Sequence, residues 1–88
     1  MSDTDRLKRL KFRAWHRGTR EADYMIGGFF DRHSAEWGEE ELCWYEAVVE
    51  EDDVDIMAWA LGTGEPPAHL DHPALIAAMR RLDYIPLP

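Results

Sequence analysis

The sequence predicts an all-α protein, a compact bundle of about five short helices. Apolar residues recur at the three- and four-residue spacing of amphipathic helices, and almost no stretch alternates as a strand would. Glycines and prolines divide the chain into segments of helical length. Its 88 residues are enough for one small domain, spanning 1–88, in which residues 1–4 and 85–88 are expected to be mobile.

The first two helices are expected on either side of a corner. The first begins with a cap at Asp3 to Asp5 and ends at Gly18. The second runs from about 20 to 33, and Gly27 and Gly28 interrupt its apolar stripe, which allows a neighbouring element to approach closely. The apolar faces are Leu7, Leu10 and Ala14 in the first helix, and Ala22, Met25, Ile26, Phe29 and Phe30 in the second.

A third and a fourth helix follow in the acidic middle of the chain. Gly38 is the expected cap of the third helix, which stops near Glu51. Asp53 is the expected N-cap of the fourth helix, which ends at Gly62 and Gly64. The apolar faces are Leu42, Tyr45, Val48 and Val49 in the third helix, and Ile56, Met57, Ala60 and Leu61 in the fourth.

The fifth helix begins at Pro73, a residue favoured at the first helical position, with Asp71 or His72 before it. Pro66 and Pro67 make the preceding loop extended. The buried positions of this helix are Leu75, Ile76, Met79 and Leu82.

Charge and cysteine content exclude several classes of function. The formal net charge of −8 repels the phosphates of DNA and RNA, so no nucleic-acid partner is expected. Cys43 is the single cysteine, and a small half-buried residue is the simplest interpretation of it. No apolar run is long enough to span a membrane, and MSDTDRLKRLKF resembles neither a signal nor a transit peptide. We therefore expect a cytoplasmic protein that is not inserted into a membrane.

Motifs for a metal or a bound cofactor are absent from the sequence. His69 and His72 stand three residues apart but fall in a loop and at a helix start, and the acidic run 50–55 lacks the spacing of a calcium loop. Trp44 and Trp59 belong to helices that need core residues, whereas Trp15 lies beside a turn. No metal and no stably bound cofactor are expected.

The corner HRGTRE, residues 16–21, has more charge than a turn needs. Arg17 places a cation at a helix end, Gly18 supplies a left-handed residue, Thr19 can cap the next helix and Glu21 lies in its first turn. One cation and one acid would be enough for these local roles. The junction instead carries two arginines, Arg17 and Arg20, and two acids, Glu21 and Asp23. A purely structural corner accounts for each residue singly and is the favoured interpretation from the residues alone, but it does not explain this surplus.

The sequence resembles the family of succinate dehydrogenase FAD assembly factors. The carrying motifs are RGTREAD, then FFD five residues later, then VVEEDDVDIMAWALGTGEPP, and the resemblance covers residues 6–83. It implies a small helical bundle that binds the flavoprotein subunit of succinate dehydrogenase, and often of fumarate reductase. Such a protein promotes covalent attachment of FAD to a histidine of that subunit, and is not itself an enzyme.

The resemblance also implies which residues meet the partner. The family's Arg-Gly-x-x-Glu motif falls on Arg17, Gly18 and Glu21, with its next acidic position at Asp23. Arg17 would then pair with an acceptor near the flavin site, Gly18 would let the backbones approach, and Glu21 would accept hydrogen bonds from the partner or fix Arg17. The full predicted partner-binding set is Trp15, Arg17, Gly18, Arg20, Glu21 and Asp23. The chain departs from the family pattern at Ala22, Gly28 and Val54.

Two other classes of function remain open from the sequence. One is a small acidic regulatory module such as an antitoxin, which would bind a different protein partner. The other is a small enzyme that uses Arg17, Glu21 and a histidine. Identification of the bound protein separates the first from an assembly factor, and activity of the isolated chain would support the second.

Overall fold

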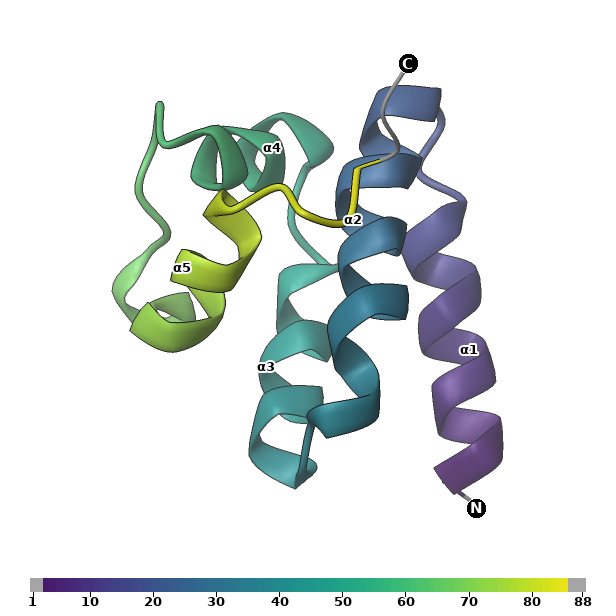
Figure 1. Cartoon of the computed structure of the whole chain (residues 1–88). Helices are drawn as coiled ribbons and strands as arrows, with labels where there is room; N and C mark the ends of the chain where they lie inside the picture. Colours follow the sequence, from purple (N-terminus) through teal and green to yellow (C-terminus); the bar gives the residue numbers. More distant parts are fainter. Residues whose placement is uncertain (1–2, 86–88) are drawn as a thin grey trace.

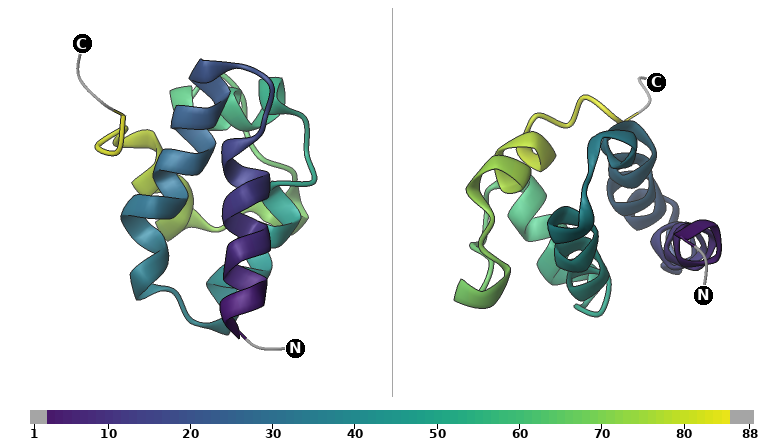
Figure 2. Two further views of the ribbon diagram at one scale, coloured as in Figure 1. Left: turned by 90° about the vertical axis from the view of Figure 1, so that its right-hand side faces the viewer. Right: turned by 90° about the horizontal axis from the view of Figure 1, so that it is seen from below.

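The structure, a computed structural model, describes residues 3–85 and confirms the all-α class. Figure 1 shows α1 and α2 as an antiparallel pair at one side of the bundle, with α3, α4 and α5 on the other side of α2. Views from two further directions place α1 and α5 at opposite edges (Figure 2). The helices in this range are α1 (Asp3–Trp15), α2 (Arg20–His33), α3 (Glu39–Val48), α4 (Asp53–Leu61) and α5 (Pro73–Arg80), with short 3-10 turns at η1 (Ser34–Glu36) and η2 (Ala68–Leu70).

The segments predicted to be mobile, 1–4 and 85–88, lie mostly outside the described residues. Asp3 and Thr4 are described, and both belong to α1. At the other end, the Ile85 N–H donates to the Leu82 carbonyl at 3.4 Å. The mobility of the two ends stays a prediction.

Local capping signals place most helix starts as predicted. The Thr19 hydroxyl accepts the Ala22 N–H at 3.2 Å, and His72 Nδ1 accepts the Leu75 N–H at 3.4 Å, so each caps its helix. Gly38 is the N-cap of α3. The predicted N-cap of α4 was wrong by one residue, because Asp52 has the extended backbone of a cap and Asp53 is already helical. The ends of α1 and α3 come earlier than predicted, at Trp15 and Val48.

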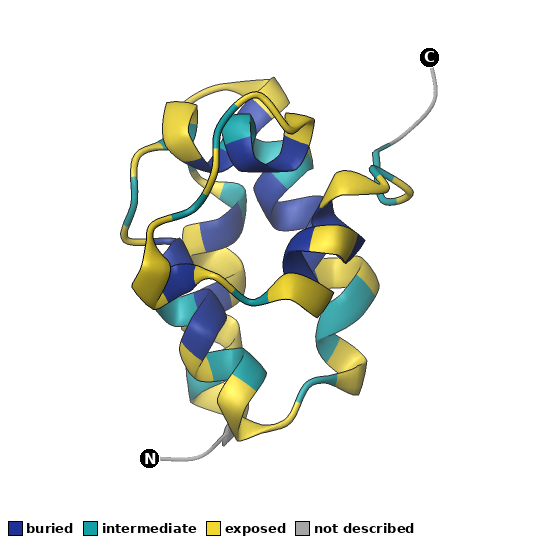
Figure 3. Ribbon diagram, turned by 90° about the vertical axis from the view of Figure 1, so that its left-hand side faces the viewer, coloured by how far each residue is buried: buried dark blue, intermediate teal, exposed yellow. Residues whose placement is uncertain are grey.

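The core is built around Tyr45, whose ring is fully buried at the centre of an aromatic cluster. Its hydroxyl donates to the Ile26 carbonyl at 2.6 Å, and Trp44 Nε1 donates to the Leu70 carbonyl at 2.7 Å. Both polar atoms are therefore satisfied inside the core, as buried donors must be. Figure 3 shows that the buried residues gather on the inward sides of the helices. The rings around Tyr45 are Phe29, Phe30, Trp37 and Trp44.

Several residues predicted to be buried or half-buried are instead exposed. Leu61 is 54% exposed and Leu7 is 37% exposed. Leu82, predicted as a buried position of the fifth helix, lies beyond the end of α5 with φ at 54° and is half-buried against the core. Cys43, expected to be half-buried, is exposed. For Leu61 the physical reason is that α4 is apolar on all sides, so the sequence period does not show which side meets the core.

Gly27 and Gly28 allow close approach, as predicted, and they do so for two different neighbours. The Trp15 indole lies against Gly27, where a Cβ atom would overlap Trp15 Cδ2. A Cβ atom at Gly28 would meet the Tyr84 carbonyl oxygen at 3.0 Å. Together the two glycines bring α1 and the segment after α5 against α2.

Replacing Gly27 with valine is expected to destabilise the protein by about 1–3 kcal/mol, because the added atoms overlap the Trp15 ring and force it to move. Thermal unfolding monitored by circular dichroism measures the change. Ala77→Val, on the exposed side of α5, is the control for placing a β-branched side chain in a helix. Equal melting temperatures for the two variants would contradict this account of Gly27.

Candidate functional site

The backbone of the corner 16–21 is held in one conformation by its own residues. Gly18 has φ at 109°, a region that side chains other than glycine rarely adopt. The Arg17 N–H donates to Asp23 Oδ1 at 2.7 Å, and the Asp23 N–H donates to the Thr19 carbonyl at 3.0 Å. Asp23 therefore closes the turn from α2. The local roles predicted for Gly18 and Thr19 are confirmed.

The Arg17 side chain ties this corner to the junction between α3 and α4. Its side chain is only 10% exposed, and Nε donates to Asp53 Oδ1 at 2.7 Å. Nη1 donates to the Val49 carbonyl at 2.9 Å, and Nη2 donates to the Glu51 carbonyl at 3.0 Å. Nη1 also lies 3.3 Å from the Arg13 carbonyl at the end of α1. The guanidinium therefore binds acceptors within the chain, and it holds the corner in place from its inner side.

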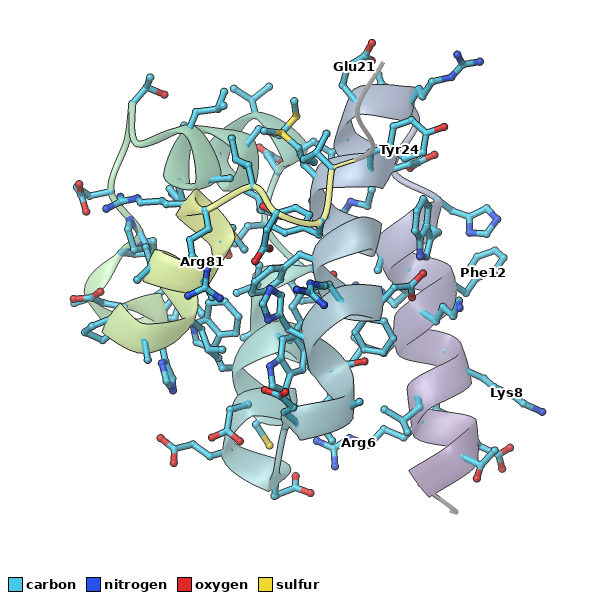
Figure 4. All side chains as sticks on the ribbon, in the orientation of Figure 1. Arg6, Lys8, Phe12, Glu21, Tyr24 and Arg81 are labelled. Carbon is cyan, nitrogen blue, oxygen red and sulfur yellow. The ribbon has the colours of Figure 1, made fainter. Side chains whose placement is uncertain are left out.

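Arg20 and Glu21 form the outward side of the corner. Both residues are exposed, and within residues 3–85 neither side chain makes a hydrogen bond or an ion pair. Figure 4 shows the Glu21 side chain projecting away from the bundle. Of the two roles predicted for Glu21, fixing Arg17 was wrong, because Asp53 holds that guanidinium. Arg20 and Glu21 are therefore free to meet another molecule.

Trp15 and Tyr24 border two shallow hollows beside the corner. Their rings meet edge to face with centroids 6.0 Å apart. One hollow, of about 670 Å³, extends from this pair over the corner, and the other, of about 590 Å³, extends toward the segment after α5. The first is lined by Trp15, His16, Gly18, Thr19, Arg20, Asp23 and Tyr24, and the second by Trp15, Tyr24, Gly28, Asp31, Arg32, Asp83, Tyr84 and Ile85.

Of the predicted set, Trp15, Gly18, Arg20 and Asp23 line one hollow together, whereas Arg17 lies behind it and Glu21 lies outside it. Trp15 Nε1 is buried, and no acceptor in the described part of the chain reaches it.

Sequence reasoning missed Asp53 as the partner of Arg17, and it missed Tyr24 and Tyr84 at the hollows. The position of Tyr24 one turn after Arg20 carried a weak signal, since it places an aromatic ring on the same side of α2. The position of Tyr84 in the sequence gave no such signal, because only the tertiary structure brings Tyr84 against α2. Its hydroxyl donates to the Met79 carbonyl at 2.7 Å, and burial raises its pKa above the ordinary value.

Charge is distributed very unevenly along the chain. Residues 3–20 contain seven arginines and lysines and two acids, whereas residues 33–79 contain twelve acids and neither lysine nor arginine. Ion pairs of Arg6 with Glu39 and Glu46, at 2.7 and 2.6 Å, hold α1 against the acidic half. The hydrogen bond from Arg6 lowers the pKa of Glu39 to about 2. The basic helix and the acidic middle of the chain are therefore electrostatically complementary.

Within residues 3–85, no helix combines the length and apolar character that a membrane span requires. The same residues contain no group of three or more His, Cys, Asp or Glu side chains placed to hold a metal ion.

Comparison with known proteins identifies related chains. The family model described as "Flavinator of succinate dehydrogenase" matches residues 8–83. The chain is similar to the FAD assembly factor SdhE of Acetobacter pasteurianus, with 44% identity over 57 residues. That alignment covers 65% of this chain and 52% of the relative, about half of its length. No solved structure matches the chain.

Proposed function

This chain belongs to the family of flavinators of succinate dehydrogenase, and we therefore propose that it acts as a flavin assembly factor. In this role it binds the flavoprotein subunit of succinate dehydrogenase and promotes covalent attachment of FAD to a histidine of that subunit. It is not itself an enzyme and holds no cofactor stably, and it acts on the FAD of its partner. The family match does not favour the antitoxin-like alternative.

One observation supports docking at the corner above all others. Arg20 and Glu21 are exposed without partners, on a turn that Arg17 and Asp23 already hold in place. A preformed surface loses little conformational freedom on binding, so more of the contact energy appears as affinity. The corner therefore suits a rigid docking contact.

The proposed mechanism uses binding energy and needs no catalytic group on this chain. Flavin attachment requires the isoalloxazine ring and the acceptor histidine to be held together, and orientation of two reacting groups can remove several kcal/mol of a barrier. A protein that binds one domain arrangement of the flavoprotein more tightly than others shifts the population toward it. Action on the flavoprotein of fumarate reductase and a cytoplasmic location stay predictions.

Glu21→Ala is expected to leave the protein folded and to abolish its support of covalent flavinylation. The loss of one carboxylate from the first turn of α2 costs about 0.3–1 kcal/mol of stability, whereas the loss of a central interface charge can cost more than about 2 kcal/mol of binding. Thermal melting of the purified variant measures stability. In-gel fluorescence of covalent flavin, in deletion cells that carry the variant, measures function.

Glu40→Ala is the matched control, because Glu40 is an exposed glutamate in the first turn of α3. We expect it to lose similar stability and to retain full flavinylation. If Glu21→Ala also retained full flavinylation, Glu21 would have no part in the function. The same result for Arg20→Ala would remove the corner from the proposed site.

A further inference from the structure

The outward side of α4 is apolar, and its two aliphatic ends, Val54 and Leu61, are exposed in the described part of the chain. Ile56, Trp59 and Ala60 are buried against the core. On the opposite side Val54 is 78% exposed and Leu61 is 54% exposed. Met57 and Ala58 flank them and are only half-buried. We call these four residues, Val54, Met57, Ala58 and Leu61, the α4 face.

The residues of the α4 face are spaced like the buried side of a helix, although the core lies on the opposite side of α4. Its members stand at i, i+3, i+4 and i+7, so they form one continuous stripe. A helix with apolar residues on every side is usually buried on every side. A surface helix of an isolated domain would instead carry polar residues at these positions. The α4 face therefore has the character of a contact surface.

The start of the α4 face is negatively charged. Asp52 and Asp55 are exposed at the start of the helix and have no ion-pair partner in the described residues. Two other acids of the run 50–55 are already neutralised, Glu50 by Arg13 and Asp53 by Arg17. At the other end of α4, Arg80 donates to the Trp59 carbonyl and pairs with Glu65, so the unpaired negative charge beside the stripe lies at the helix start.

We propose that the α4 face docks against a segment of the flavoprotein partner in which apolar side chains are flanked by lysine or arginine. This inference rests on the proposed function and extends the contact beyond the corner. Asp53 joins the two surfaces, since it holds Arg17 on one side and precedes Val54 on the other. Figure 1 shows α4 at the same end of the bundle as the α1–α2 corner.

Charge decides between this occupant and a second copy of the chain. Two copies that met through the α4 face would bring acidic edges together, and like charges across an interface oppose association. A basic partner segment would gain from the same charges, and its apolar side chains would fill the stripe as in other helix-mediated recognition.

The test compares binding of the purified protein and its variants to the FAD-loaded flavoprotein subunit. For the double variant Val54→Ser, Leu61→Ser we expect the Kd to rise tenfold or more, because two aliphatic side chains no longer leave water on binding. Its melting temperature should stay close to that of the wild type, since both residues are exposed. Phe12→Ser is the control, because Phe12 is 61% exposed but lies on α1.

A second variant tests the charge of the partner without removing an apolar group. Asp55→Lys is expected to raise the Kd several-fold and to reduce its dependence on salt, since it places a cation opposite cations. Unchanged or tighter binding by Asp55→Lys would overturn the basic character of the partner segment.

The remaining outcomes separate this inference from the proposed function. If the wild type and the double variant bind equally well, the α4 face is not a docking surface and the assembly-factor function stands. If the wild type does not bind the subunit, both fail. Wild-type self-association, in analytical ultracentrifugation, that the double variant lacks would assign the face to a second copy and overturn the proposal.

Discussion

Replacing Trp59 with alanine is expected to lower the free energy of unfolding by about 3–5 kcal/mol, which is the cost of deleting a large buried aromatic side chain. Trp59 is only 4% exposed and lies on the inner side of α4, whose backbone is also held by Arg80 at the Trp59 carbonyl. Small domains have a total stability of about 5–15 kcal/mol, so this change removes a large part of it. Thermal unfolding should show a melting temperature lower by more than about 10 °C.

Leu61→Ala on the same helix is the control for Trp59→Ala. Leu61 is 54% exposed, so truncating it should change stability by no more than about 1 kcal/mol. An unchanged melting temperature for Trp59→Ala would show that the indole is not part of the core. Because Trp59 stabilises the fold, any loss of flavinylation in cells should follow the loss of folded protein.

Replacing Arg17 with alanine is expected to destabilise the protein by about 2–4 kcal/mol. The change leaves Asp53 without its ion pair and removes the donors to the carbonyls of Val49 and Glu51, all at a largely buried site. Flavinylation should fall as well, because the corner that carries Arg20 and Glu21 is no longer held in place by the Arg17 guanidinium. Thermal melting and covalent-flavin fluorescence together measure both effects.

Arg13→Ala and Arg17→Lys are the two comparisons for this result. Arg13 is 45% exposed and pairs with exposed Glu50, so its loss should cost at most about 1 kcal/mol. Lysine at position 17 keeps the charge but lacks the planar fork that reaches four acceptors, so we expect intermediate stability. An Arg17→Ala protein with wild-type stability and no flavinylation would contradict a positioning role and support the direct partner contact predicted from the sequence.

The predictions that the structure confirms concern interactions between residues close in the sequence. Thr19 and His72 cap helices by bonding an N–H three residues away, and Gly18 takes the backbone conformation that ends a helix. Helical periodicity placed the core residues of α2 because that helix has one apolar side. The exposed charges of the corner were also foreseen, since they exceed what a turn requires.

The features that the sequence did not predict depend on residues far apart in the chain. Arg17 meets Asp53 across 36 residues. Tyr84 lies against Gly28 and contributes to a hollow with Tyr24. No local signal encodes such pairs, because each partner is compatible with many others until the helices pack. The predicted site therefore contained the corner but lacked Asp53, which holds Arg17, and the two tyrosines that border the hollows.

The sequence by itself determined that this chain forms short helices, where most of them begin, and that residues 16–21 form a charged corner. Only the tertiary structure decided which side of α4 is buried and whether Arg17 faces inward. The physical reason is range: capping and helical periodicity act over three or four residues, whereas burial depends on which surfaces meet. In α4 both sides are apolar, so the sequence assigned Ile56 and Leu61 alike to the buried face, and only the neighbours of the helix bury the first and leave the second exposed.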